Sequence, residues 1–451
     1  MAMRLTIKEG NENLTSHSGL ALIGALIART KLKDRLNELH LTGCDVPKIS
    51  HSDMILSMVG LICLGKPDYE AIEPFRDDPF FMKSLDIEAC PAAPSLRQRI
   101  DMVKGAADKI LKEESSELIR RCAPKIGVLE TSVGEYVPLD LDVSPFDNSK
   151  TQKEGVSRTY KGMDGYSPNF SYLGSEGYLV NVELREGSQH CQKGTPEFLK
   201  ESILYAKRIT PRKLLVRMDS GNDSVDNRSV LEEEHVDYII KRNPRKEDPK
   251  AWLKLAQGKG TKQTPRQGKT VWRGRTDIDI KGNPLSTSIV FEVIERTINK
   301  HKEFLVIPEI EVNTYWVTLD VSVDDAIWFY QDHGTSEQFH SELKSDMDLE
   351  RLPSKYFKSN ALILLLGMVA YNMLRLCGQE SLREDNGNVE KIPGLRKKVQ
   401  RRRVRTIIQD LIYMAGRIIH TGRRWCISFG KMNPFRDLWK SIYQRFAMNS
   451  V

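Results

Sequence analysis

The chain lacks paired cysteines, a signal-like start and a long apolar run. Its seven cysteines are scattered and include no Cys-x2-Cys pair, which excludes a clustered thiolate metal site and indicates free thiols in a reducing compartment. The opening MAMRLTIKEG contains no apolar signal core. The strongest apolar run, ALILLLGMVAY, is too short to span a bilayer, so we interpret it as a buried helix. We find no internal repeat and no low-complexity tract.

Two short apolar segments of the sequence each end in acidic residues. In YVPLDLDVS, apolar side chains alternate with Asp140 and Asp142, which predicts a half-buried strand with both aspartates on its other face. In KLLVRMDSGNDS, the run from Leu214 to Met218 ends in Asp219 and a glycine follows. A strand followed by an acid and a glycine is how an α/β sheet presents a ligand at a strand's carboxyl end.

A third acidic position lies in YQDHGTSEQFHSELK, residues 330–344. If the second part of this segment is helical, Glu337 and Lys344 share one face, because seven residues are close to two turns. Phe339 and Leu343 then lie on the opposite side and can anchor the helix to a core. A carboxylate and an amine that project together suit a site that holds a metal ion beside a phosphate. The alternative is a surface helix with solvated charges.

The spacing of Tyr330, Glu337 and Lys344 resembles the Tyr-x2-Arg-x3-Glu-x6-Lys signature of DDE transposases from bacterial insertion sequences. His333 stands where that family has arginine, which leaves a side chain that can still donate a hydrogen bond to phosphate but whose charge depends on pH. As the pH rises from about 6 to 8, DNA cleavage or binding to the element ends is then expected to weaken more in this protein than in a His333→Arg variant. The resemblance implies that Glu337 is the third catalytic carboxylate on a ribonuclease H-like fold.

The same resemblance assigns the other two carboxylates. In the family they lie on the first strand and at the end of the fourth strand, which matches Asp142 and Asp219, with Asp140 and Asp223 as neighbouring alternatives. Three acidic positions in the expected order, on the expected element types, would rarely coincide by chance.

The chemistry that the resemblance implies is cut-and-paste transposition. Three carboxylates can hold two divalent ions about 4 Å apart, and oxygen ligands favour Mg²⁺, with Mn²⁺ able to substitute. The element ends would be hydrolysed and then joined to target DNA, with no covalent protein intermediate. Tyr330, His333 and Lys344 would contact phosphates near the cut. The implied partners are double-stranded DNA (element ends and target) and a second copy of the chain in a homodimer.

The segments between the acids predict the element order of that fold. NFSYL and GYLVNVELREG predict two more strands, Thr195 and Pro196 open a helix to about Ala206, and a helix from Ser224 to Glu234 precedes a strand in VDYIIKR. We therefore expect an α/β protein. Its parts would be a ribonuclease H-like core with a β-rich insertion, a helical N-terminal domain and a basic helical C-terminal region.

Roughly ninety residues separate the last of these strands from the Glu337 helix, and a linker of that length needs structure of its own. KTVWRGR, STSIVFEVIER, EFLVIPEIEV and TYWVTLDVS predict strands. Residues 241–281 contain thirteen Lys or Arg against four Asp or Glu, and GKGTKQTPRQGK is typical of a flexible strip on a phosphate backbone. Many relatives stack a flipped base on an aromatic residue, which makes Trp272 and Trp316 candidates, although either is more often a core residue.

The N-terminal region is expected to be mainly helical, over 18–41 and 54–64 and in PSLRQRIDMVKG, where Ser95 would be the cap. Arg97 and Arg99 could enter a DNA groove, or the region could be a purely structural helical cap. The predicted parts are residues 1–130 (helical, DNA-end binding), 131–245 (core, first part), 246–325 (basic β-rich insertion), 326–380 (core, second part, with the Glu337 helix) and 381–451 (basic C-terminal region).

The net charge of +7 is unevenly distributed, with fifteen basic and two acidic residues in 391–451. In residues 396–405, RKKVQRRRVR, seven of ten are Lys or Arg and precede an amphipathic helix that would include Val404 and Ile418. Positive charge at a helix N-terminus opposes the macrodipole, and a phosphate backbone would relieve the penalty. We therefore expect Arg401, Arg402 and Arg403 to bind DNA phosphates; the alternative is an acidic partner protein.

Other functions remain compatible with the sequence. A domesticated descendant could bind DNA without transposing, and a site-specific metal-dependent DNA nuclease could use the same carboxylates without strand transfer. A metal-dependent phosphatase fits less well, because it would not need the basic insertion and tail. We expect a cytoplasmic protein with no membrane contact, associated with the nucleoid when bound to DNA.

Overall fold

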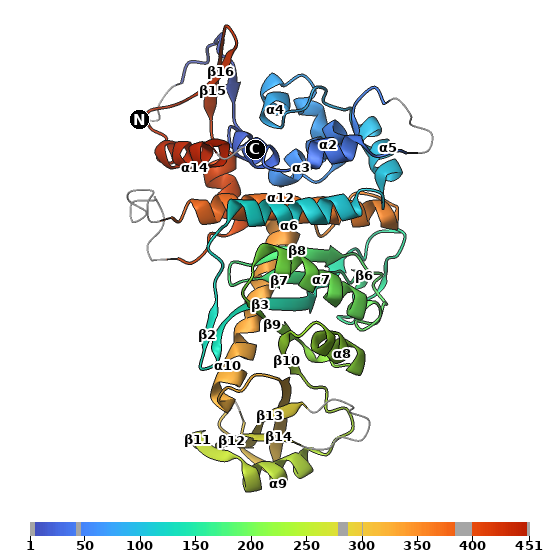
Figure 1. Cartoon of the computed structure of the whole chain (residues 1–451), viewed down its shortest axis with the longest axis vertical. Helices are drawn as coiled ribbons and strands as arrows, with labels where there is room; N and C mark the ends of the chain where they lie inside the picture. The colour runs from blue at the N-terminus through green and yellow to red at the C-terminus, as the bar shows by residue number, and fades with distance from the viewer. Residues whose placement is uncertain (1–4, 42–46, 278–286, 300, 384–398, 449–451) are drawn as a thin grey trace. The chain divides into compact units, whose positions relative to one another are not determined.

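The computed structural model describes residues 5–41, 47–277, 287–299, 301–383 and 399–448 (Figure 1). The chain forms two compact units: unit 1 comprises Met1–Pro124 and Glu342–Val451, and unit 2 comprises Lys125–Ser341. The expected α/β class is confirmed. These units divide the chain differently from the five predicted parts, because the segment 326–380 contributes to both.

Unit 2 is built on a ten-stranded mixed sheet, in the order β11-β12-β13-β14-β10-β9-β3-β7-β8, with β2 paired to β3. β3 runs parallel to β9 and antiparallel to β7, and β9 runs parallel to β10. The strands of this half are β2 (Leu129–Thr131), β3 (Gly134–Val143), β7 (Asn169–Leu173), β8 (Tyr178–Glu183), β9 (Lys213–Met218) and β10 (Asp237–Lys241). Short strands β4 (Phe146–Asp147), β5 (Ser157–Arg158) and β6 (Asp164–Tyr166) form a separate small sheet.

The predicted order of three strands, helix, strand, helix and strand is confirmed in β3, β7, β8, α7 (Thr195–Ile209), β9, α8 (Val225–Glu233) and β10. Ser224 caps α8 through its side chain, whereas the cap of α7 is Gly194 and not Thr195. β3 is not half-buried as expected. It is a central strand with neighbours on both sides, and Asp140 on it is only 2% exposed.

The β-rich segment extends the same sheet. It contains α9 (Pro249–Lys259), β11 (Thr261–Arg266), β12 (Lys269–Thr276), β13 (Ser288–Ile298) and β14 (Phe304–Val317). Helix α9, which the sequence analysis missed, packs on β12, β13 and β14 (Figure 1). The expected flexible strip is instead the exposed edge strand β11, paired with β12, and two predicted strands are the single strand β14.

After the sheet, unit 2 ends in consecutive helical segments: α10 (Val323–Asp332), a 3-10 turn (His333–Thr335) and α11 (Ser336–Ser341). Ser322 caps α10 by accepting a hydrogen bond from the backbone N–H of Asp325. Ala326, Ile327 and Phe329 bury the inner side of α10 in a cluster that includes Ile239 and Tyr315 of the sheet. The predicted helix around Glu337 is therefore confirmed.

Unit 1 is helical apart from one small sheet. Its first part contains β1 (Leu14–Thr15), α1 (Leu20–Ile27), α2 (Leu32–Asn37), α3 (His51–Cys63), a 3-10 helix (Tyr69–Phe75), α4 (Pro79–Ser84), α5 (Ala93–Val103) and α6 (Asp108–Cys122). Its second part contains a π-helical turn (Glu342–Asp346), α12 (Phe357–Glu380), α13 (Val404–Ile407), a second π-helical turn (Ile408–Ile412), β15 (Gly416–Thr421), β16 (Arg424–Phe429) and α14 (Arg436–Met448).

The N-terminal helices confirm the predicted helical character, with local corrections. Helix α5 begins at Ala93, so Ser95 lies inside it and is not its cap. Ile418, expected on a helix after the basic tract, lies on β15. The first three residues of that tract, 396–398, lie outside the described residues.

Helix α12 contains the apolar run interpreted as a buried helix, and that interpretation is confirmed. The helix packs between α3 and α6 (Figure 1). Within the described residues, α12 alone is long and apolar enough to cross a bilayer, which corrects the length argument made from the run, but 94% of its apolar window is buried in the protein. The six described cysteines are free.

A buried ion cluster joins α12 to the basic tract in unit 1. The Glu342 carboxylate, 1% exposed, accepts hydrogen bonds from Arg375 of α12 at 2.5 Å and from Arg401 at 3.0 and 3.1 Å. The Val404 amide donates to it at 3.1 Å. A buried charge is stable only when it is paired and hydrogen-bonded, so Glu342 and Arg375 depend on each other.

We expect Glu342→Gln to destabilise unit 1 by about 3–5 kcal/mol, because Arg375 would keep its charge where water is excluded. The loss would appear as a lower thermal midpoint and faster amide hydrogen exchange in α12. The exposed Glu88→Gln variant in the same unit should change neither. Unchanged exchange in α12 would show that the ion cluster does not stabilise this unit.

Candidate active site

Two of the predicted carboxylates lie side by side at one end of the sheet. Strands β3 and β9 run parallel with Asp140 opposite Arg217 and Leu141 opposite Met218. Asp142 and Asp219 are the next residues along each strand, so they occupy equivalent positions at the two carboxyl ends. Neighbouring strands lie about 4.8 Å apart, and residues in register point to the same face. Asp142, Asp219 and Asp140 therefore share one face of the sheet.

Asp140 forms a buried ion pair with Arg217. Arg217 donates to both of its carboxylate oxygens, from Nε at 2.6 Å and from Nη2 at 2.7 Å, and both side chains are almost fully buried. Burial alone would raise the pKa of Asp140, but Arg217 and His333 hold that pKa at about 2. The two rival acids differ in exposure: the side chain of Asp140 is 3% exposed, whereas that of Asp142 is 22% exposed.

His333 is buried beside Asp140 and does not lie on an open surface. Its Nδ1 is 3.1 Å from Asp140 Oδ1 and its side chain is 9% exposed. Burial lowers the pKa of the imidazole, but the Asp140 carboxylate raises it more, so the net shift is upward. The sequence analysis missed this carboxylate partner, and a phosphate contact by His333 stays a prediction.

Asp142 is held by two groups from α11. His340 Nε2 lies 3.0 Å from Asp142 Oδ2, and the Ser336 hydroxyl donates to the same oxygen at 3.2 Å. The other ring nitrogen of His340 lies 3.0 Å from the Tyr172 hydroxyl on β7. A neutral imidazole satisfies both contacts if Nε2–H donates to Asp142 and Nδ1 accepts from Tyr172. Burial raises the pKa of Asp142, but these hydrogen bonds lower it overall.

Asp219 is in a different electrostatic environment. Its pKa is raised, first by burial and then by the negative charge of Asp142. The Asn222 amide donates to Asp219 Oδ1 at 2.9 Å, which fixes the carboxylate over the short turn that follows β9. Two neighbouring carboxylates, one of which resists ionisation, form a site that a cation would stabilise.

Glu337 lies on α11 and is exposed. The helix is anchored by Phe339, whose ring lies 5.0 Å from that of Tyr172, as the sequence pattern predicted. Gly177 makes this packing possible, because a Cβ there would lie 2.5 Å from the Phe339 ring. Within the part of the chain that the structure describes, no three Asp, Glu, His or Cys side chains lie close enough together to form a finished metal site.

Tyr160, which the sequence did not indicate as a site residue, interacts electrostatically with all three predicted carboxylates. Its hydroxyl donates to the Val143 carbonyl at 3.2 Å, while 69% of the residue is exposed. Burial of the hydroxyl, followed by the charges of Asp142 and Asp219, raises the pKa of Tyr160 to about 12. Glu337 contributes in the same direction. The YKG segment of Tyr160 has no distinctive spacing, so only the fold could reveal this neighbour.

Tyr330 and Lys344 belong to different compact units. Tyr330 is half-buried on α10, with its ring 4.8 Å from that of Tyr315. Burial and then Asp219 raise its pKa. Lys344 lies on the π-helical turn of unit 1. The predicted signature therefore spans the boundary between the units, and its phosphate contacts stay predictions.

The two tryptophans proposed for base stacking are buried. Trp272 is 6% exposed and Trp316 is 3% exposed. Trp316 donates from Nε1 to Asp223 Oδ1 at 2.9 Å and is flanked by the guanidinium of Arg228, 4.2 Å from the ring. Asp223 is thus a partner of Trp316. In this structure both indoles have the core role that the sequence analysis gave as the alternative.

The arginines predicted to bind DNA are paired within unit 1. Arg401 binds Glu342, Arg402 is buried against Asp410, and Arg403 donates to Asp346 at 2.7 and 2.9 Å. These carboxylates neutralise, inside the protein, the positive charge that the sequence places at the start of α13. DNA binding by the three arginines stays a prediction.

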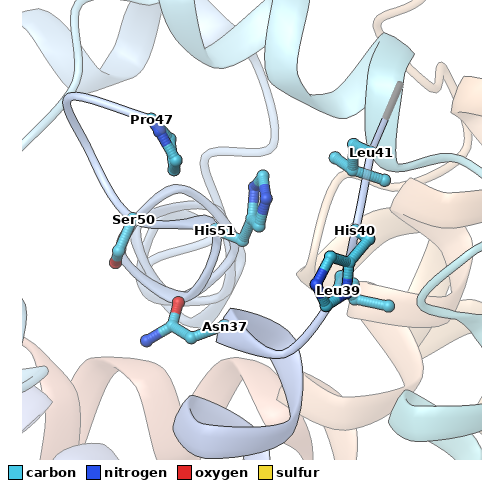
Figure 2. Close-up of a pocket in the computed structure, with 7 residues that line it drawn as sticks. All are labelled: Asn37, Leu39, His40, Leu41, Pro47, Ser50 and His51. Carbon is cyan, nitrogen blue, oxygen red and sulfur yellow. The ribbon is translucent and has the colours of Figure 1, made fainter. Parts of the chain in front are cut away.

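A pocket of about 290 Å³ in unit 1 lies at the start of α3 (Figure 2). Figure 2 shows the His51 ring, from α3, and Asn37, from α2, among its lining residues. The described residues that line it are Asn37, Leu39, His40, Leu41, Pro47, Ser50 and His51, and none of these carries a carboxylate. Arg99, considered as a groove-binding residue, contacts the His51 ring at 2.8 Å and is buried, and Arg97 pairs with Glu70.

We expect Asp142→Asn to lower the pKa of Asp219. Removing a neighbouring negative charge favours the ionised form of the remaining carboxyl, so its pKa should fall towards the ordinary value. Carboxyl ¹³C NMR titration measures this directly. The exposed Asp147→Asn variant is the control and should leave Asp219 unchanged. If Asp142→Asn also leaves it unchanged, the two carboxylates are not neighbours in solution.

Comparison with known proteins gives one decisive match. The model of a family described as transposase DDE domain group 1 matches residues 2–450. No curated protein matches the chain. Among solved structures, the chain is similar to one described as a cryo-EM structure of the piggyBac transposase synaptic complex with hairpin DNA. The TM-score is 0.39 with 11% identity, over 89% of this chain and 80% of that one. A likeness at this level supports no conclusion about function.

The family match includes both compact units and every residue of the acidic site described above. The chain therefore belongs to the transposase DDE domain group 1 family.

Proposed function

We propose that this protein is a cut-and-paste DNA transposase of an insertion sequence, in which Asp142, Asp219 and Glu337 form the catalytic carboxylate set. Membership of a transposase family implies an enzyme that cleaves DNA and transfers strands. Beyond family membership, we propose that the reaction is cut-and-paste transposition, that these three carboxylates catalyse it, and that unit 2 is a ribonuclease H-like domain. It also places the chain in the Tyr-Arg-Glu-Lys signature group of bacterial elements.

The observation that supports this proposal best is the register of β3 and β9. It brings Asp142 and Asp219 from 77 residues apart to equivalent positions on adjacent parallel strands. The carboxyl ends of parallel strands are where α/β proteins bind ligands. Burial and then the negative charge of Asp142 raise the pKa of Asp219, and the second effect is what two close carboxylates on adjacent strands produce.

The donor set fits divalent ions, which transposases of the DDE kind generally use. Carboxylate oxygens are hard ligands, and Mg²⁺ is the ion we propose, as two ions held by Asp142, Asp219 and Glu337, with Mn²⁺ able to substitute. When bound, such ions activate the attacking oxygen and stabilise the leaving oxygen of an in-line phosphoryl displacement. Because Glu337 is exposed, we propose that it approaches the two aspartates when DNA binds.

The chain's own groups would position the reacting partners. His340 and Ser336 hold one oxygen of Asp142, which leaves its other oxygen available as a ligand. Asn222 plays the same part for Asp219. Tyr330, Lys344 and His333 are proposed phosphate contacts, although His333 would first have to turn away from Asp140. The proposed partners are double-stranded DNA, as element ends and target, and a second copy of the chain in a homodimer.

Three variants test the carboxylate set: Asp142→Asn, Asp219→Asn and Glu337→Gln. Each should lower DNA cleavage by about 10²–10³-fold or more, because each removes a negative ligand from a site whose function is charge stabilisation. Cleavage by the unaltered protein should stop in EDTA and return with Mg²⁺ or Mn²⁺. Duplex binding, measured in parallel, should persist in all three variants.

The control for this test is Asp147→Asn, an exposed position on β4, four residues after the end of β3 at Val143. It should cleave normally. Cleavage at full rate by Glu337→Gln would remove Glu337 from the proposal, and EDTA-resistant cleavage would remove the metal ions.

A separate comparison distinguishes Asp140 from Asp142. Asp140→Asn should destabilise the protein by about 3–5 kcal/mol, because it leaves the buried Arg217 without a full counter-charge. Asp142→Asn should have a much smaller effect on stability and a much larger one on cleavage. Thermal midpoints and cleavage rates of the two variants, measured side by side, check this. The reverse pattern would make Asp140 the catalytic acid.

A further inference from the structure

The C-terminal hairpin of unit 1 has a firmly packed base and an exposed tip. β15 and β16 pair from Gly416 with Phe429 to Thr421 with Arg424, which leaves Gly422 and Arg423 as a two-residue turn. Gly422 has φ of +60°, as the first central position of a tight hairpin turn requires. At the base, the Phe429 ring lies 4.9 Å from that of Trp439 on α14. The hairpin therefore has a fixed register and a defined anchor.

Large polar and aromatic side chains gather at the tip, where they contribute little to the core. His420 and Trp425 face each other across the two strands, with ring centroids 4.4 Å apart at an interplanar angle of 22°. Both are exposed, and Trp425 is 44% exposed. Arg423 lies in the turn and Arg424 on the opposite face of the strand from Trp425, and both are exposed. Figure 1 shows β15 and β16 projecting beyond α14.

The charges of the C-terminal region fall into two groups. Arg401, Arg402 and Arg403 are neutralised by carboxylates of unit 1, as described above. By contrast, Arg423 and Arg424 pair with no carboxylate among the described residues. Residues 413–448 contain seven Lys or Arg and one acidic residue, Asp437. Three of these seven are paired, Arg417 with Glu12, Arg436 with Asp437 and Arg445 with Glu380. The tip of the hairpin therefore carries positive charge that no described carboxylate neutralises.

We propose that the β15–β16 hairpin is a double-stranded DNA-binding ribbon. This inference rests on the proposed transposase function and moves the expected DNA contact of the C-terminal region from residues 401–403 to the hairpin tip. β1 pairs with β15 only at its base, Leu14 with Arg417 and Thr15 with Gly416, so the tip of the hairpin is a two-stranded ribbon. A two-stranded ribbon fits the width of a DNA groove, and unpaired arginines are complementary to the phosphates that border it. Arg423 and Arg424 bind phosphates, while the stacked His420 and Trp425 pair contacts the sugar and base edges.

The test uses the full-length protein and a fluorescently labelled duplex of mixed sequence, in EDTA so that no cleavage occurs. The double variant Arg423→Ala, Arg424→Ala should bind about 10–100-fold more weakly at low salt. Its slope of log K against log salt should be smaller by up to about two, one unit for each lost phosphate contact. Restoring the charge in Arg423→Lys, Arg424→Lys should restore most of the slope. Trp425→Ala should weaken binding without changing the slope.

The matched control is Lys109→Ala, Lys200→Ala, which removes one exposed positive charge from α6 and one from α7, neither of them paired with a carboxylate among the described residues. It should leave affinity and slope unchanged. An unchanged slope in the hairpin variant, with an unchanged thermal midpoint, overturns the inference, as does an equal loss in the control, which would reflect net charge alone. The two hypotheses fail differently. If the unaltered protein binds and cleaves DNA but the hairpin variant matches it, only the ribbon is wrong. If the unaltered protein binds no duplex, the proposed function fails as well.

Discussion

Arg217 is the residue on which the arrangement of unit 2 depends. Its buried guanidinium binds both oxygens of Asp140 on β3, the Phe329 carbonyl at 2.6 Å and Asp332 at 3.0 Å. One side chain of β9 therefore joins the neighbouring parallel strand to the end of α10. A buried cation without these acceptors would be very unfavourable, so strand register and helix position are fixed together. Asp142 and Asp219, two residues further along the two strands, lie next to each other because this pairing fixes the strand register.

Asp142 and Asp219, which follow this ion pair along the strands, have pKa values shifted in opposite directions. His340 and Ser336 favour the ionised form of Asp142, and the ionised Asp142 in turn disfavours ionisation of Asp219. A fold gains nothing in stability from two such carboxylates beside each other, and the arrangement is understandable if a cation occupies the space between them. Burial of its hydroxyl and then the charges of the same acids raise the pKa of Tyr160.

In the C-terminal region, the number of basic residues in a segment does not by itself show which of them can bind an external partner. Fifteen basic residues in 391–451 suggested that the densest tract binds DNA. The fold places Glu342 and Asp346 against that tract, and their buried carboxylates take up the charge of Arg401 and Arg403. The charge left for an external partner lies on the β15–β16 hairpin, whose first strand contains Ile418, a position that the sequence periodicity had assigned to a helix.

The sequence by itself determined the order of strands and helices in the core, the helix at Glu337 and the anchoring by Phe339, because these follow from apolar periodicity along neighbouring residues. It also indicated Asp142 and Asp219, as acids that end apolar runs. It could not distinguish Asp140 from Asp142, assign His333 to a carboxylate, or find His340 and Tyr160 near the acids. Those facts depend on contacts between residues far apart in the chain, and only the tertiary structure decides which charges are buried together.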